Sequence, residues 1–60
     1  MKFRIIKLDS LYRIFLTNVE TVEHVTLTDT KNVFKTEQEA INFLNVEYND
    51  CLIDIKTGIV

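Results

Sequence analysis

Two runs of β-branched and aromatic residues, 2–8 and 11–17, open the chain, and only Asp9 and Ser10 separate them. Residues of these types favour strands. A two-residue link between two strands leaves room only for a tight hairpin turn, and Asp and Ser are both turn residues. The first part of the chain is therefore predicted to fold back on itself as an antiparallel β-hairpin.

Three further strands are predicted after this hairpin. Residues 21–28 predict the third strand, and the polar residues 29–32 predict a turn after it. Residues 33–35 predict a short fourth strand. Residues 51–57 predict the last strand because apolar and polar residues alternate along them, and Gly58 predicts a positive-φ turn at its end.

The start of a helix is the clearest local signal in the chain. Residues 36–39 match a capping box, in which the Thr36 oxygen accepts a hydrogen bond from the third helical amide and Glu39 reaches back to the Thr36 amide. Apolar residues then recur at helical spacing, and the helix is expected to end near residues 49–50. These apolar residues are Ala40, Ile41, Phe43, Leu44 and Tyr48.

The order β-β-β-(β)-α-β predicts one small α+β domain over residues 1–60, with a mostly antiparallel sheet and one helix packed on one face. A chain of this length buries only about 60% of the surface that its unfolded form exposes. The length also excludes a dinucleotide-binding fold and an α/β barrel. We expect Ile14, Leu44 and Ile53 to be fully buried between sheet and helix.

The two-residue turn also assigns the side chains of the hairpin to its two faces. It places Leu8 opposite Leu11 and Phe3 opposite Leu16, and side chains alternate along each strand. The more apolar face, called the first face, is expected to meet the helix. The first face carries Phe3, Ile5, Lys7, Tyr12, Ile14 and Leu16. The second face carries Arg4, Ile6, Leu8, Leu11, Arg13 and Phe15, with Lys2 and Thr17.

The second face is unusual because large apolar side chains alternate there with arginines. One helix covers only one face of a sheet, so a monomer would expose a contiguous apolar patch, and such patches mark interaction sites. We expect this face to be buried by a second copy of the chain or by a target protein. The expected partner-binding residues are Arg4, Ile6, Leu11, Arg13 and Phe15. The alternative is that the loop at residues 29–35 folds over this face and completes a core.

Charge is distributed unevenly along the chain. Residues 1–16 carry four cations against one acid, whereas residues 17–60 carry three cations against eight acids, and the net charge is −2. Phe15 with Arg4, Arg13 and Lys2 is a weak form of the aromatic and basic surface that binds single-stranded nucleic acids. A nucleic-acid partner is less favoured than a protein partner, because there is one such aromatic residue and the chain is acidic.

No residues are predicted to be catalytic or to bind a metal or a cofactor. His24 is the single histidine, has no spaced histidine or cysteine ligands, and is predicted to be a half-exposed strand residue. Cys51 alternates with Ile53 and Ile55, which predicts a small buried hydrophobic residue. A single cysteine excludes an internal disulfide and favours the cytoplasm, and no apolar run is long enough for a membrane span.

The sequence therefore predicts a non-enzymatic, cytoplasmic protein-interaction module. Seven Ile, seven Thr, five Lys and five Asn are typical of AT-rich genomes, which suggests a phage or mobile-element accessory protein that binds and modulates a host protein. Two alternatives stay open: a small nucleic-acid-binding regulator that uses the basic N-terminal hairpin, and a purely structural homodimer subunit.

Overall fold

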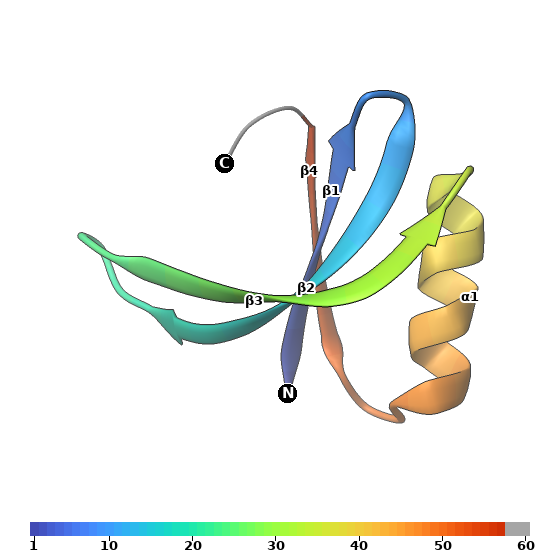
Figure 1. The fold of residues 1–60 in the computed structure, drawn as a ribbon. Coiled ribbons are helices and arrows are strands. Elements are labelled where there is room, and N and C mark those ends of the chain that lie inside the picture. The colour runs from blue at the N-terminus through green and yellow to red at the C-terminus, as the bar shows by residue number, and fades with distance from the viewer. Residues whose placement is uncertain (58–60) are drawn as a thin grey trace.

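The computed structural model describes residues 1–57, which form a four-stranded mixed sheet with one helix on one face (Figure 1). The elements are β1 (Lys2–Leu8), β2 (Leu11–Glu20), β3 (Val25–Phe34), α1 (Glu37–Glu47) and β4 (Leu52–Thr57). The strand order is β3-β2-β1-β4. The predicted α+β class, with one helix on one sheet face, is confirmed.

The predicted hairpin of β1 and β2 forms in the predicted register. Leu8 pairs with Leu11, and Phe3 pairs with Leu16. Asp9 and Ser10 both have positive φ angles, 52° and 66°. Positive φ at both central residues is the requirement of a type I′ turn, whose twist matches that of the flanking strands. The division of the hairpin into a first and a second face follows from this register.

Helix α1 begins at the predicted cap. The Thr36 hydroxyl oxygen accepts a hydrogen bond from the Glu39 amide at 3.2 Å. The return contact differs from the prediction, because the Glu39 carboxylate accepts from the Thr36 hydroxyl at 3.0 Å rather than from the Thr36 amide. At the other end the Tyr48 amide donates to the Leu44 carbonyl at 2.8 Å. Asp50 then takes a left-handed φ of 60°, which directs the chain toward β4.

The predicted turn at residues 29–32 and the separate strand at 33–35 are wrong. Both segments belong to the continuous strand β3 up to Phe34, and the register with β2 shifts opposite Ile14. The extra residues form a β-bulge in which Lys31 has a φ of 69° and its amide donates to the Asp29 carboxylate at 2.8 Å. Polar residues that readily adopt a left-handed backbone conformation therefore form a bulge within the strand here, and the chain does not reverse its direction.

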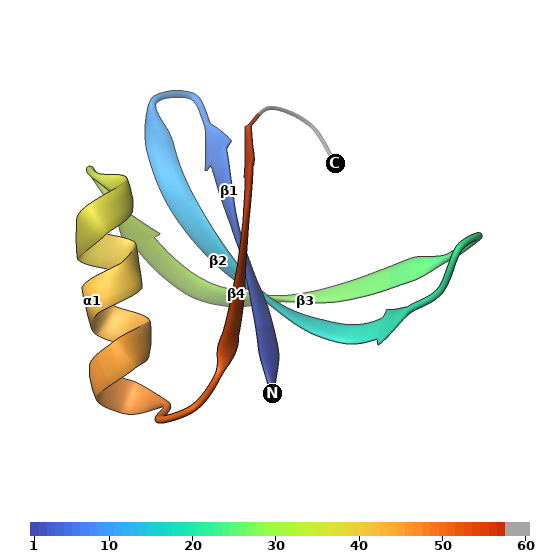
Figure 2. The ribbon, with the colours of Figure 1, turned by 180° about the vertical axis from the view of Figure 1, so that it is seen from behind.

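The last strand crosses to the far edge of the sheet. Helix α1 connects β3, at one edge, to β4 at the other edge, and β4 pairs in parallel with β1 (Figure 2). This crossover gives the sheet its mixed character. The turn expected at Gly58 lies outside the described residues.

The core lies between α1 and the first face of the sheet. Its fully buried members are Phe3, Ile5, Ile14, Ala40 and Leu44. Around them pack half-buried apolar side chains, among which the rings of Phe34 and Phe43 lie 5.3 Å apart. The predicted burial of Ile14 and Leu44 is confirmed. The predicted full burial of Ile53 is wrong, because this residue lies on the edge strand β4 and stays half-buried.

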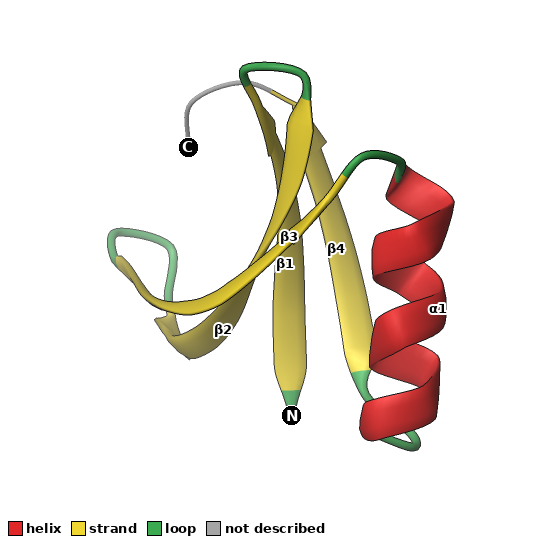
Figure 3. Cartoon of the chain, turned by 45° about the vertical axis from the view of Figure 1, so that its right-hand side comes forward, coloured by secondary structure: helices red, strands yellow, loops and turns green. Residues whose placement is uncertain are grey.

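The outer halves of β2 and β3 leave the main sheet as a two-stranded ribbon. The pairing of β1 with β2 ends at Leu16, and the residues beyond it pair only with β3. A second bulge at Asn18 bends this ribbon, because Thr17 pairs with Leu27 but Val19 pairs with Thr26. The ribbon, residues 17–28, is called the arm, and it turns to the side of the sheet opposite α1 (Figure 3).

Candidate functional site

The second face of the sheet is less open than the sequence indicated. Arg4 and Ile6 are buried within the chain, with exposed fractions of 5% and 1%. Leu11, Arg13 and Phe15 are half-buried. The expectation that this face is left uncovered in a monomer is therefore wrong for Arg4 and Ile6. For Arg4, the expectation left out an ionic network with Glu20 of the outer part of β2.

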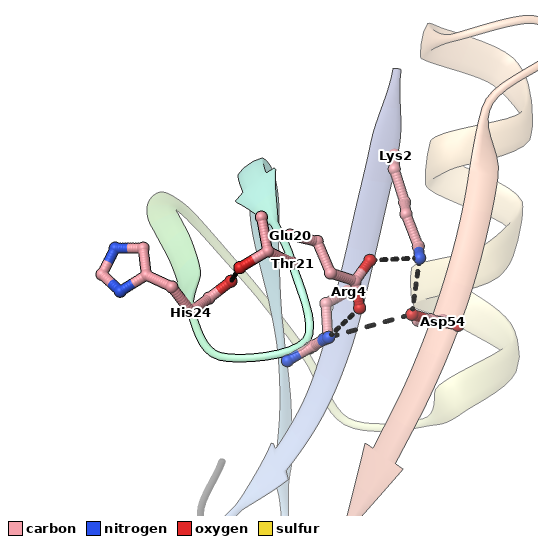
Figure 4. A network of polar contacts seen from close by, with 6 residues as sticks. All are labelled: Lys2, Arg4, Glu20, Thr21, His24 and Asp54. Atoms are coloured by element: carbon pink, nitrogen blue, oxygen red, sulfur yellow. Dashed lines mark hydrogen bonds and ion pairs between the residues drawn. The ribbon is translucent and has the colours of Figure 1, made fainter.

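The ionic network joins three strands across the second face (Figure 4). The Glu20 carboxylate accepts a hydrogen bond from Lys2 Nζ and lies 3.2 Å from Arg4 Nη2. Asp54 lies 3.3 Å from Lys2 Nζ and 3.9 Å from Arg4 Nη2. Glu20 comes four residues after Leu16, the last residue of β2 in register with β1. Its carboxylate reaches β1 because the arm bends back over this face.

The residues of the network differ in their exposure to solvent. The side chains of Lys2, Glu20 and Asp54 are each about one-third exposed, whereas the Arg4 side chain is 6% exposed. The hydrogen bond from Lys2 to Glu20, and then that to Asp54, raise the pKa of the Lys2 ammonium group above its ordinary value of 10.5. Two cations and two carboxylates compensate each other, which offsets the cost of burying the Arg4 guanidinium.

Two buried polar atoms of the second face are left without hydrogen-bond partners among the described residues. They are Arg4 Nε and the Thr17 hydroxyl oxygen. Arg4 therefore uses Nη2 for both carboxylates, while the neighbouring donor on the same guanidinium has no acceptor. Buried donors without acceptors are rare in proteins and call for a physical reason.

Three of the five predicted partner-binding residues remain accessible together with one residue that the prediction did not include. Val33 of β3 lies directly opposite Arg13 and is 41% exposed. We define Leu11, Arg13, Phe15 and Val33 as the Arg13 surface. No carboxylate of the described residues forms an ion pair with Arg13. The alternative that a loop at residues 29–35 covers this face is wrong, because residues 25–34 are a strand of the sheet.

The histidine and the cysteine lie in separate environments. His24 is exposed in the connection between β2 and β3, one residue before β3 rather than within a strand, and its Nε2 lies 3.2 Å from the Thr26 hydroxyl. Cys51 packs against the core and is half-buried rather than buried. Within residues 1–57 no three His, Cys, Asp or Glu side chains gather in a way that could hold a metal ion.

The chain matches no protein-family model, no curated protein sequence and no solved structure. In the described part of the chain, no helix has the length and apolar character that a membrane crossing requires.

Proposed function

We propose that the chain is a non-enzymatic protein-interaction module that binds an acidic partner protein through the Arg13 surface. The observation that carries this proposal is the setting of Arg13. Arg13 is half-buried on the same face as Leu11 and Phe15, and no carboxylate of the described residues pairs with it. Arginine and aromatic side chains in such settings are enriched in the centres of protein interfaces.

A carboxylate is the partner group that best fits this arginine. The planar guanidinium binds a carboxylate through two parallel hydrogen bonds, and the apolar neighbours strengthen that contact by excluding water. The apolar side chains of the Arg13 surface would meet apolar side chains of the partner beside that carboxylate. A protein segment with acidic and apolar residues supplies both groups.

A protein partner is favoured over a nucleic acid by the charge balance of the second face. Nucleic-acid binding depends on several Lys or Arg contacts with phosphates. Lys2 and Arg4, which the sequence offered beside Arg13 for that role, each lie beside the carboxylates of Glu20 and Asp54. Arg13 is then left as one cation beside Phe15, which supports recognition of a single carboxylate more than that of a phosphate chain.

The cellular setting that we propose is an accessory protein of a phage or mobile element, acting in the cytoplasm on a host protein. This part of the proposal depends on the small size of the chain, its Ile-, Thr-, Lys- and Asn-rich composition and its single cysteine. Binding rather than catalysis is supported by the separate environments of His24 and Cys51, which do not form a nucleophile with its base.

The experiment compares the parent chain with Phe15→Ala and Arg13→Glu in capture of binding proteins from host lysate, with sedimentation to give the oligomeric state. We expect Phe15→Ala to weaken association by more than about 2 kcal/mol, as the loss of a central aromatic anchor does, and Arg13→Glu to abolish it. Lys7→Glu is the matched control, because it makes the same charge change on the exposed Lys7 side chain of the first face. Melting curves establish that each variant is folded.

The proposal fails if both variants keep the parent's oligomeric state and capture the same protein. A stable dimer with no captured protein would indicate a purely structural homodimer subunit instead. Salt-dependent binding of oligonucleotides that Arg13→Glu abolishes would indicate a nucleic-acid-binding regulator.

A further inference from the structure

We propose that Lys2 and Arg4 form a second binding site, for a carboxylate of the partner, and that Glu20 is the chain's own occupant of this site. On this view the acidic partner segment displaces Glu20 and lifts the arm away from β1. The inference builds on the proposed acidic protein partner, and it assigns a competitor within the chain that the proposed function alone does not require.

Glu20 uses only part of the hydrogen-bonding capacity of the Arg4 guanidinium. Nε and Nη2 lie along one edge of this planar group, and a carboxylate that meets the edge squarely accepts from both. Glu20 places one oxygen 3.2 Å from Nη2 and gives its other oxygen to Lys2, while Nε has no acceptor among the described residues. A carboxylate free to choose its position would satisfy both donors, so Glu20 is a poor fit to this edge.

Glu20 is also carried by a weakly anchored element, the arm. The arm is a two-stranded ribbon, and such ribbons are at best marginally stable in water. Its valines bury little surface, since Val19, Val22 and Val25 have exposed fractions of 48%, 105% and 38%. Among the described residues, the side-chain hydrogen bonds and ion pairs between the arm and β1 all come from Glu20. When a partner carboxylate displaces Glu20 from Arg4, the polar side-chain contacts between the arm and β1 are therefore lost.

Positive charge remains at the site when Glu20 leaves. Lys2, Arg4 and Asp54 then carry a net charge of +1, because Asp54 stays beside Arg4 as its register partner on β4. One carboxylate neutralises that charge. A phosphate chain would bring further negative charges close to Asp54, and this chain already carries a net negative charge. A protein segment is therefore favoured over a phosphate chain as the occupant.

The positions of Arg4 and Arg13 also indicate the spacing of the acidic residues in the partner. Arg4 of β1 lies opposite Phe15 of β2, and Arg13 lies two residues before Phe15 on β2. Such diagonal neighbours on one face lie about 7–8 Å apart. Alternate residues of an extended peptide lie about 7 Å apart on one side of the chain. We therefore expect an extended segment with two acidic residues separated by one residue.

The test uses a short capped peptide in which two glutamates flank one leucine, and a matched peptide with glutamine in place of both glutamates. Both are titrated by NMR into the parent, Glu20→Gln and the control Asp29→Asn. Asp29→Asn removes one negative charge from the same face, at the position next to the arm, and its amide oxygen still accepts from the Lys31 amide. We expect Glu20→Gln to bind the glutamate peptide about tenfold more tightly than the parent, because its internal competitor is weakened.

The same titration has two further expected results. Asp29→Asn binds the glutamate peptide like the parent, and the glutamine peptide binds none of the three proteins. The Arg4 Nε–H signal shifts as the glutamate peptide binds, and Arg4→Lys in the Glu20→Gln background removes the gain in affinity, since lysine lacks the two-donor edge.

The inference is wrong if Glu20→Gln binds the glutamate peptide no better than the parent, or if Asp29→Asn gains as much. It is also wrong if a thymidine oligonucleotide binds Glu20→Gln more tightly than the peptide does. Should Glu20→Gln fail to fold, the parent decides: saturating peptide must remove the nuclear Overhauser contacts between Glu20 and Arg4, and their persistence contradicts the displacement. Arg13→Glu separates the two proposals, because it weakens peptide binding if the Arg13 surface is the interface, whether or not Glu20 competes.

Discussion

Leu44→Ala tests the arrangement of the core, on which the position of every second-face residue depends. Leu44 is completely buried in the middle of α1 and packs with Phe3, Ile5 and Ile14 of the first face. Truncation of a buried leucine costs about 2–5 kcal/mol, partly through the cavity that remains. The whole free energy of unfolding of a 60-residue domain is about 3–9 kcal/mol. The variant is therefore expected to lose between about a fifth and all of the stability of the parent.

The assay is urea unfolding followed by far-ultraviolet circular dichroism. Val46→Ala is the matched control, because Val46 lies two residues further along the same helix and is 79% exposed. Its free energy of unfolding should change by less than about 0.5 kcal/mol. If Leu44→Ala and Val46→Ala shift the unfolding midpoint equally, the face of α1 that meets the sheet is assigned wrongly.

Three smaller effects follow from single contacts. Thr36→Ala should lower the free energy of unfolding by about 1 kcal/mol through loss of the helix cap, and thermal melting beside Thr36→Ser should show the loss in the alanine variant alone. Thr30→Val removes the hydroxyl that donates to the Ile14 carbonyl at 2.8 Å inside the β3 bulge, which should cost about 1 kcal/mol in urea unfolding. The raised pKa of Lys2 means that its stabilising contribution is complete below the ordinary value of 10.5 and disappears as pH rises through the higher folded value. The melting temperature of the parent should therefore fall toward that of Lys2→Met at strongly alkaline pH, and a constant difference between them would contradict the pairing with Glu20.

The features that sequence predicted correctly depend on neighbours in the chain. Asp9 and Ser10 leave room for one turn, so the register of β1 with β2 and the two faces of the hairpin follow directly. The cap at Thr36 needs only the residues up to Glu39. In both cases the interacting groups are few residues apart, and local stereochemistry decides the outcome.

The closure of the second face depends on contacts between distant residues and on one irregularity of β2. Strict alternation from Thr17 would place Glu20 on the first face, beside the helix. The bulge at Asn18 inserts one residue and moves Glu20 to the second face, where it meets Arg4 from 16 residues away. Nothing in the residue pattern marks Asn18 as a bulge, so the partner of Arg4 could not be found from the sequence.

The polar segment in β3 shows a different ambiguity. Asp29 and Lys31 favour the same left-handed and side-chain-bonded backbone in a turn and in a bulge. Which of the two forms is decided by whether the residues after the segment continue to pair with β2, as Val33 and Phe34 do. Tertiary packing against Tyr12 and the helix makes that choice, whereas the local residue pattern favours the turn.

The most direct test of the central claim, that Glu20 closes the second face by binding Arg4, is a double-mutant cycle of Arg4→Met and Glu20→Gln in urea unfolding. Glu20 is one-third exposed, so solvent weakens its interaction with Arg4 below the value for a fully buried pair. We predict a coupling free energy of about 1 kcal/mol between the two positions, within the range seen for residues in direct contact. A coupling within about 0.3 kcal/mol of zero would show that the two side chains act independently, and would contradict both the closed second face and the displacement of Glu20 by a partner.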